Sequence, residues 1–274
     1  MAGHARNAPS DAKRWIMCPG ALKRCSDLGI VDKGSSAAAD EGTAAHWIRE
    51  QCLEFGFDAF DFLGARVLVN GVSYECDMGM VEALQPGLDR IREFEGEFFI
   101  ERRLNITKWT GKTEDGEDQF GTLDCGVVPH GWQGDEAVVS DLKYGRGVPV
   151  DAVENPQQVI YSASLWELIK HDFPHIKRFR IIIDQPRNGA GGGEWVITVD
   201  ELLEKAQAIR EAADKTFDPN APCTPSTEGC MWCPASKVIG NCPEHDAFAL
   251  ELGDVREADL DDYDDWDEPL PLPD

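Results

Sequence analysis

Two aspartates and a lysine stand on neighbouring segments that both have the pattern of a β-strand. Asp141 and Lys143 end the apolar run 137–140, and Asp124 lies in the preceding apolar segment. Because strand residues two positions apart point to the same face, Asp141 and Lys143 should project together. Two carboxylates can hold a divalent cation that activates water, and an ammonium group can orient that water or stabilise a charged transition state. These residue types suit the hydrolysis of a phosphodiester.

Three further residues extend this set, and their spacing is typical of helices. His46 lies one turn inside a predicted helix, and Gln157 and Tyr161 are four residues apart, so they share one face of another helix. We expect His46, Asp124 and Asp141 to bind a metal ion. The carboxylates suit Mg²⁺ or Mn²⁺, and the imidazole shifts the preference toward Mn²⁺. Gln157 and Tyr161 would hold the active-site strand or a nucleic-acid backbone.

In this order, the motifs resemble those of the RecB-like branch of the PD-(D/E)XK nuclease superfamily. That branch carries a helix histidine, a G-x-x-D acid, a D/E-x-K pair and a Q-x-x-x-Y helix. The corresponding residues here are His46, Asp124, Asp141 with Lys143, and Gln157 with Tyr161. The resemblance covers roughly residues 9–245, and the segments 14–20, 40–46 and 141–145 look like a phage and prophage family of the same type.

The resemblance implies a restriction-endonuclease-like α/β core, with a mixed central sheet flanked by helices. It also implies a Mg²⁺- or Mn²⁺-dependent deoxyribonuclease, an exonuclease of phage DNA replication or recombination with DNA as its partner. Lys143 would be the catalytic lysine, supported by Gln157 and Tyr161. Glu101 falls where such nucleases often carry a strand glutamate near the site.

Each motif has a plainer explanation when it is taken alone. His46 could be a core or capping histidine, Asp124 a turn acid, and Lys143 the flank of a strand. The occurrence of all the motifs in order favours the nuclease. Two other hypotheses stay open. One is a non-catalytic acidic binding protein or DNA mimic on a degenerate nuclease fold, and the other is a zinc-stapled RNA-processing factor.

Three of the nine cysteines lie close together near the C-terminal end. Cys230 and Cys233 form a C-x-x-C motif, Cys242 precedes a proline, and Cys18 precedes another proline far upstream. This arrangement resembles the iron–sulfur staple of some RecB-like nucleases, which implies a 4Fe–4S cluster held by these four thiolates. The gap between Cys233 and Cys242 is longer than in that pattern.

A structural zinc ion is the main alternative to the cluster. Its four ligands would be Cys223, Cys230, Cys233 and Cys242. Reduced thiols or a metal site are expected rather than disulfides, because no export signal is visible. The other cysteines are expected to be buried small hydrophobic residues, namely Cys25, Cys52, Cys76 and Cys125.

The hydrophobic periodicity predicts helices and strands in a mixed α/β order. Helices are expected at 43–55, 77–95, 155–171 and 201–217. Strands are expected at 98–106, 121–129, 136–143, 178–185 and 195–199, and a hairpin at 66–74. The expected N-caps are Thr43, Asn155 and Asp200.

The net charge of −25 argues against wide, non-specific binding to duplex nucleic acid. Part of it lies in residues 251–274, which contain eleven acids and one arginine. A local basic groove could still work, because salt screens charges over about 10 Å. The basic residues considered for phosphate contact are Arg102, Arg103, Lys108, Arg146, Arg178, Arg180 and Arg187.

We expect a flexible N-terminal arm at 1–14 and a nuclease domain at 15–250 that includes a metal staple at 223–242. Residues 251–274 should form a disordered acidic tail, or a docking peptide for a phage or host recombination or replication protein. No apolar run reaches the roughly 18 residues of a membrane span. A cytoplasmic protein with no membrane partner is therefore expected.

Overall fold

The computed structural model describes residues 6–30 and 36–252. The expected acidic tail lies outside the described residues except for Glu251 and Leu252, and so does the start of the expected N-terminal arm. None of the described helices is both long and apolar enough to cross a membrane.

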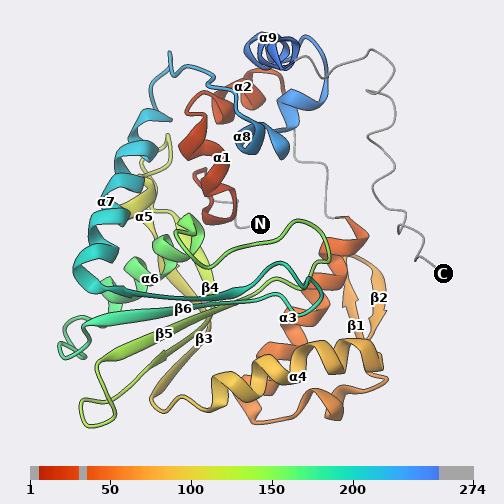
Figure 1. Ribbon diagram of the computed structural model, residues 1–274, viewed down its shortest axis with the longest axis vertical. Coiled ribbons are helices and arrows are strands. Elements are labelled where there is room, and N and C mark those ends of the chain that lie inside the picture. Colours follow the sequence, from red (N-terminus) through yellow and green to blue (C-terminus); the bar gives the residue numbers. More distant parts are fainter. Residues whose placement is uncertain (1–5, 31–35, 253–274) are drawn as a thin grey trace.

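A five-stranded mixed sheet forms the centre of the molecule (Figure 1). Its strands follow one another in chain order: β3 Glu97–Asn105, β4 Phe120–Val128, β5 Glu136–Leu142, β6 Arg178–Asp184 and β7 Gly193–Thr198. Neighbouring strands are antiparallel except for β5 and β6, which are parallel. A parallel pair needs a crossover connection, and helix α6 (Pro156–Ile169) supplies it. The expected α/β class is confirmed.

Helices cover both faces of this sheet (Figure 1). Successive side chains of β5 point to opposite faces of the sheet, so they show which helices cover each face. Val139 belongs to the core closed by α6 and α7 (Val199–Lys215), and Val138 to the core closed by α4 (Met78–Arg92). Helix α3 (Ala37–Phe55) packs against α4. The sheet is therefore the middle of three layers, with α3 and α4 on one face and α6 and α7 on the other.

Shorter elements complete the described chain. The expected hairpin is confirmed as β1 (Arg66–Val69) and β2 (Val72–Glu75). The 3₁₀-helix η2 (Ala59–Phe62) and helix α5 (Thr107–Thr110) lie within connections. Two groups come from the ends of the chain and gather at one end of the molecule in Figure 1. They are η1 Pro9–Asp11, α1 Ala12–Met17 and α2 Ala21–Asp27, with α8 Thr227–Met231, η3 Pro234–Lys237 and α9 Pro243–Glu251.

The expected N-cap of α3 is wrong, because the helix begins six residues before Thr43, at Ala37. The Ser36 side chain caps it by accepting a hydrogen bond from the Ala39 amide. Thr43 lies inside the helix, where its hydroxyl donates to the Ala39 carbonyl. The small residues before Thr43 show no apolar periodicity, and they continue the helix because alanine favours it.

The expected cap of α7 is also wrong, whereas that of α6 is confirmed. Thr198 caps α7 in a reciprocal capping box with Glu201, so Asp200 lies inside the first turn. The Asn155 side chain caps α6 by accepting from the Gln158 amide. Pro156 follows at the first helical position, where no amide donor is needed.

The expectation of a flexible arm is wrong for residues 6–14, which are folded onto the domain. Asn7 is completely buried. Its side-chain amide donates to the Thr110 carbonyl and to Thr216 Oγ1, both at 3.1 Å. Its backbone amide donates to Gln119 Oε1 at 3.2 Å. Because these buried polar groups satisfy one another, the segment is fixed.

Candidate functional site

Strands β4 and β5 separate at the two aspartates. The last paired positions of these strands are Cys125 and Ser140, and Asp124 and Asp141 come one step beyond them. There the Leu142 amide donates a hydrogen bond to Asp124 Oδ2 at 2.9 Å. The carboxylate thus takes the place that a strand carbonyl would have in a continued antiparallel pair.

Asp141, Lys143 and Gln157 form a closed set of contacts. Lys143 Nζ lies 2.8 Å from Asp141 Oδ2 and donates to Gln157 Oε1 at 3.0 Å. Gln157 Nε2 donates in turn to Asp141 Oδ1 at 3.3 Å. Each of the three side chains is therefore held by the other two.

The Lys143 ammonium group keeps its charge in this site. Burial by itself would lower the pKa of Lys143, but the adjacent Asp141 carboxylate, with Asp124 behind it, raises the pKa. The lysine can therefore act as a fixed positive charge rather than as a base that takes up a proton.

His46, Glu101 and Asp124 bring three ligand atoms together. His46 Nδ1 lies 3.3 Å from Asp124 Oδ2. One donor atom of each residue lies within 4.8 Å of the other two. Helix α3 supplies the imidazole, and β3 and β4 supply the carboxylates. Two oxygen ligands and one imidazole nitrogen suit Mn²⁺ or Mg²⁺.

Glu101 reaches this set because of the register between β3 and β4. The paired positions on either side of it put Glu101 opposite Asp124. Its backbone φ is +43°, a left-handed conformation that costs a non-glycine residue free energy. Sequence reasoning gave Glu101 a secondary place, and the pairing of the two strands brings it into the ligand set.

Burial and mutual repulsion raise the pKa values of these carboxyl groups. For Asp124, burial is the main cause and Asp141 adds to it, while His46 and Arg49 oppose the rise. For Glu101, burial and then Asp124 raise the pKa to about 7. A bound cation would relieve this repulsion, so the distribution of charge fits a metal ion.

Arg49 is a member of the site that the sequence patterns did not reveal. It is buried, its Nη2 donates to Ser140 Oγ at 2.7 Å, and its Nη1 lies 3.7 Å from Asp124 Oδ2. Arg49 follows His46 by three residues on α3, so both side chains reach Asp124 from one helix face. This spacing was the available signal, but spacing alone does not distinguish a buried arginine from an exposed one.

Tyr161 packs where Gly121 leaves room for its ring. A Cβ added at Gly121 would lie 2.8 Å from Tyr161 Cε1, closer than real contacts allow. The ring is therefore seated on β4, three residues before Asp124. Burial, followed by the charge of Asp141, raises the pKa of Tyr161, so its hydroxyl stays protonated.

The ligand set differs in one member from the expected one. His46 and Asp124 lie together, but the third donor beside them is Glu101. The Asp141 carboxylate is instead engaged by Lys143. Asp141 as a metal ligand therefore stays a prediction.

Several of the basic residues considered for phosphate contact are engaged by acidic side chains. Ion pairs join Lys108 to Glu167, Arg178 and Arg180 to Glu136, and Arg187 to Glu41. An arginine or lysine that is already paired is a weaker candidate for binding phosphate, because its partner would first have to be displaced.

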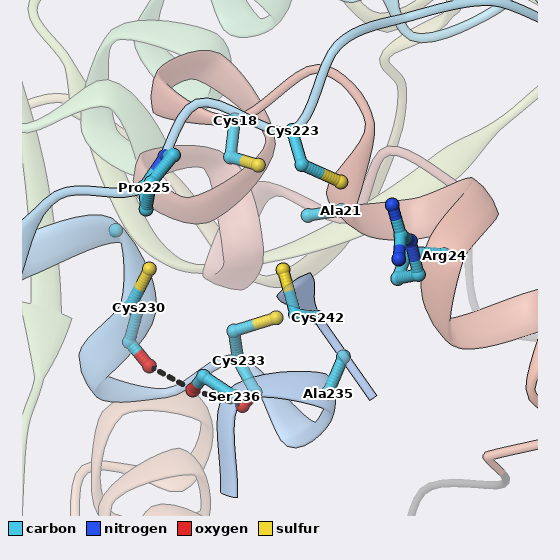
Figure 2. A pocket seen from close by; sticks show the side chains of 11 residues that line it. Cys18, Ala21, Arg24, Cys223, Pro225, Cys230, Cys233, Ala235, Ser236 and Cys242 are labelled. Carbon is cyan, nitrogen blue, oxygen red and sulfur yellow. Dashed lines mark hydrogen bonds between the residues drawn. The ribbon is translucent and has the colours of Figure 1, made fainter. Parts of the chain in front are cut away.

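Five cysteines line one small cavity between the two ends of the described chain (Figure 2). They are Cys18 after α1, Cys223 before α8, Cys230 in α8, Cys233 before η3 and Cys242 before α9. The cavity has a volume of about 10 Å³, close to that of one water-sized sphere. Both of the expected ligand sets therefore meet at one place.

Backbone amides distinguish four of these thiols from the fifth. The Thr224 amide donates to Cys18 Sγ at 3.3 Å. The backbone of Ser226 is hydrogen-bonded to Cys230, and the backbone of His245 to Cys242. Cys233 has two such partners, Ala235 and Ser236. Cys223 is hydrogen-bonded to the Arg24 side chain instead. Burial raises the pKa of Cys230 and of Cys242, and the backbone hydrogen bonds oppose this rise.

The other four cysteines differ in burial. Cys52, Cys76 and Cys125 are completely buried, as expected for small hydrophobic residues. Cys25 is half-buried, and its thiol is hydrogen-bonded to that of Cys233. The expectation is wrong for Cys25, which packs against the cysteine cavity.

Residues 4–268 match a family model described as a protein of unknown function (DUF2800). Among solved structures, the chain is similar to a candidate exonuclease from Eubacterium rectale, whose crystal structure has a resolution of 2.19 Å. The two chains are 13% identical, with a TM-score of 0.38, over 76% of this chain and 78% of the other.

Proposed function

The chain belongs to the DUF2800 family, whose description assigns no activity, and we propose that it is a metal-dependent deoxyribonuclease. The observation that carries the proposal is a set of metal-binding donor atoms next to a lysine whose ammonium group is held in place by its neighbours. His46, Glu101 and Asp124 form the donor set, and Asp141 holds the ammonium group of Lys143 beside it. Acidic ligands together with a retained positive charge are what phosphodiester hydrolysis needs.

The donor set fits Mn²⁺ or Mg²⁺. His46, Glu101 and Asp124 offer hard oxygen atoms and one imidazole nitrogen, and the repulsion between the two carboxylates favours a divalent cation. We propose Asp141 as a further donor. When bound, such an ion supplies neutralisation of the phosphate charge and a lowered pKa of a coordinated water.

The surrounding side chains position the reacting groups. Lys143 would stabilise negative charge on the phosphate as the P–O bond breaks. Asp141 and Gln157 hold its ammonium group in one place. Tyr161, seated on Gly121, holds β4 and hence the aspartate that follows.

The substrate we propose is DNA, degraded by an exonuclease of phage replication or recombination in the cytoplasm of the host. The order of the motifs supports this assignment. The net charge of −25 supports the alternative, a non-catalytic acidic binding protein or DNA mimic. We also propose that the acidic residues 251–274 dock on a phage or host recombination or replication protein.

A digestion assay tests the nuclease proposal. End-labelled single-stranded DNA, double-stranded DNA and RNA are each incubated with Mg²⁺ or Mn²⁺. We expect cleavage of DNA, and loss of about 100-fold or more of it in Lys143→Met, because one charge-stabilising group is removed. Lys177→Met is the matched control, since Lys177 is an exposed lysine directly before β6.

Loss of activity in Lys143→Met has two possible causes, the missing positive charge and a misfolded protein, and these must be separated. Lys143 is partly buried against Asp141, so thermal unfolding of Lys143→Met shows whether the variant is folded. Lys143→Arg keeps the charge and serves as a second variant. Full activity of a folded Lys143→Met would remove the lysine from the mechanism. Wild-type protein that binds DNA without cutting it would support the acidic binding protein, and cleavage of RNA alone would support the RNA-processing factor.

We propose that the cysteine cavity holds a structural metal centre. The four thiols that accept backbone amides are the set expected for a 4Fe–4S cluster. A single Zn²⁺ ion held by Cys223, Cys230, Cys233 and Cys242 is the alternative, since the same cavity contains these four thiols. Visible absorption with iron and sulfide in anaerobically purified protein would assign the cluster, and a colourless protein containing zinc would assign the ion.

A further inference from the structure

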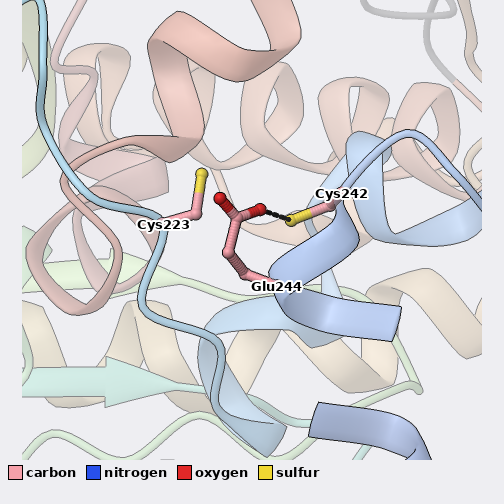
Figure 3. A group of neighbouring side chains, drawn as sticks. All are labelled: Cys223, Cys242 and Glu244. Carbon is pink, nitrogen blue, oxygen red and sulfur yellow. Dashed lines mark hydrogen bonds between the residues drawn. The ribbon is translucent and has the colours of Figure 1, made fainter. Parts of the chain in front are cut away.

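Cys223, Cys242 and Glu244 lie together at one side of the cysteine cavity (Figure 3). One ligand atom from each of them lies within 4.8 Å of the other two. Cys242 Sγ donates to Glu244 Oε2 at 3.6 Å. Figure 3 shows the Glu244 carboxylate between the two sulfur atoms. The fifth thiol of the cavity is therefore next to one particular member of the expected ligand set.

The closeness of the two sulfur atoms indicates a shared coordination position. Two thiolates on one tetrahedral metal atom, with bonds of about 2.3 Å, lie about 3.8 Å apart. The sulfur atoms of Cys223 and Cys242 lie within 4.8 Å of each other. Either sulfur atom therefore lies close to a position from which it can bind the metal atom that the other binds.

Contacts from α2 hold Cys223 at the cavity. The Arg24 guanidinium is hydrogen-bonded to the Cys223 thiol and donates to Glu244 at 2.9 and 3.0 Å. Gly20 lets the chain at 221–223 approach α2 closely, because a Cβ there would lie 2.7 Å from the Ala221 carbonyl oxygen. Arg24 and the close approach at Gly20 thus position the Cys223 thiol at the cavity.

We propose that Cys223 is a reserve ligand of the metal centre and takes the coordination position of Cys242 when that position opens. The proposal rests on the thiolate-bound centre of the preceding subsection. It applies to a thiophilic metal held by Cys18, Cys230, Cys233 and Cys242. Five thiols then serve four positions, and the centre has two ligation states.

The exchange is balanced without any electron transfer. The S–H bond of Cys223 breaks as its sulfur binds the metal atom, and Cys242 is protonated as its own bond to that atom breaks. Glu244 lies within reach of both thiols and can carry the proton between them. No oxidant or reductant is needed.

Metal analysis of cysteine variants tests the reserve ligand. Full-length protein is purified anaerobically, and iron, zinc and labile sulfide per chain are measured together with the absorption spectrum. The variants are Cys223→Ser, Cys242→Ser, the double variant, and Cys230→Ser as a reference ligand. We expect both single variants at 223 and 242 to retain metal, with a changed spectrum only in Cys242→Ser. The double variant and Cys230→Ser should lose it.

Two results would overturn the proposal: metal loss in Cys242→Ser as complete as in Cys230→Ser, or full metal content in the double variant. Wild-type protein without bound metal would overturn the centre itself, which is a separate outcome. It would leave the DNA digestion assay untouched.

A kinetic measurement covers the case in which Cys242→Ser does not fold. Cys223→Ser keeps all four amide-stabilised thiols, so its centre should assemble. We expect it to release metal to excess EDTA about 10-fold faster than wild type, because no second thiol recaptures the open position. Equal release rates would show that Cys223 takes no part in ligation.

Discussion

At the scale of single residues, the site is a balance of buried charges. Glu101, Asp124 and Asp141 come from three neighbouring strands and repel one another. Lys143 and Arg49 oppose this repulsion from two directions, since one lies against Asp141 and the other reaches Asp124. Removing one cation leaves its carboxylate partner buried without a compensating charge. The contribution of each charge can therefore be measured by substituting one residue at a time.

Glu101 should make the metal-free protein less stable as the pH rises. Its pKa in the folded protein is about 7, against an ordinary value of 4.5, so the folded state binds this proton more tightly than the unfolded chain does. Stability is therefore lost between about pH 4.5 and 7. Glu101→Gln should raise the melting temperature in EDTA more at pH 8 than at pH 5.

Thermal unfolding at the two pH values checks this prediction. Added Mn²⁺ should stabilise the wild type and have less effect on Glu101→Gln, because one ligand has been removed. An equal change in melting temperature at pH 5 and pH 8 would rule out ionisation of Glu101 as the cause.

Arg49→Met should destabilise the fold by about 3–5 kcal/mol, because it leaves a buried carboxylate without its cation. Arg49→Lys should fall between this variant and the wild type, since a lysine cannot contact both Ser140 and Asp124 with a forked head group. Urea unfolding gives the free energies. Exposed Arg102 is the control, and Arg102→Met should change stability by less than about 0.5 kcal/mol.

At the scale of elements, the geometry of the site depends on where β4 and β5 part. Their pairing ends at Cys125 and Ser140, and the next residue on each strand is an aspartate. Tyr161 packs from α6 onto β4 at Gly121, so the helix and the strand fix each other. A change in that contact should therefore alter the position of Asp124.

Gly121→Ala should reduce both stability and cleavage. The added Cβ would lie 2.8 Å from the Tyr161 ring, which must move. Overpacking of this kind costs about 1–3 kcal/mol. Gly189→Ala is the control, because a Cβ there meets nothing within 4 Å. The prediction fails if the two variants unfold at the same urea concentration and cut DNA at the same rate.

The elements themselves were largely predictable, since helix and strand periodicities are local. The exceptions are the first residues of two helices, α7 and α3. At α7, two neighbouring residues were both suitable as the N-cap. Thr198 and Asp200 are both good caps, and the end of β7 at Thr198 decides between them. The start of α3 was missed because its first residues carry no apolar pattern.

The site was predictable where its residues are close in sequence, and also where the order of the motifs grouped distant residues, as it did for His46 and Asp124. Asp141 and Lys143 share a strand face, and Gln157 lies on the helix that follows, so a pattern could group them. Glu101 and Arg49 could not be grouped in this way. Their approach to Asp124 depends on strand register and on the placement of α3, which spacing along the chain does not encode.

At the scale of the whole molecule, the cysteine cavity joins the two ends of the domain. Cys18 comes from the N-terminal helices, and Cys230, Cys233 and Cys242 come from the C-terminal ones. Gly20 is in backbone contact with Pro222 at 3.0 Å. The metal centre would therefore act as a clasp between segments about 200 residues apart.

Loss of the clasp should loosen the C-terminal helices before the sheet. In Cys230→Ser, trypsin should cut after Lys237, while the core 97–215 stays protected, because the packing of the sheet does not involve the cavity. Peptide mapping of timed digests gives the order of cleavage. Cys76→Ser, in a separate core, is the control. Simultaneous loss of both regions would show that the clasp supports the whole fold.

The position of Cys242 also sets an order of events during synthesis. A ribosome makes the N-terminal helices first, but the last thiol of their cavity, Cys242, is translated 224 residues after Cys18. The sheet can fold while the cavity is still incomplete. Metal insertion would then be a late maturation step, and a translation product truncated before Cys230 could not hold the cofactor.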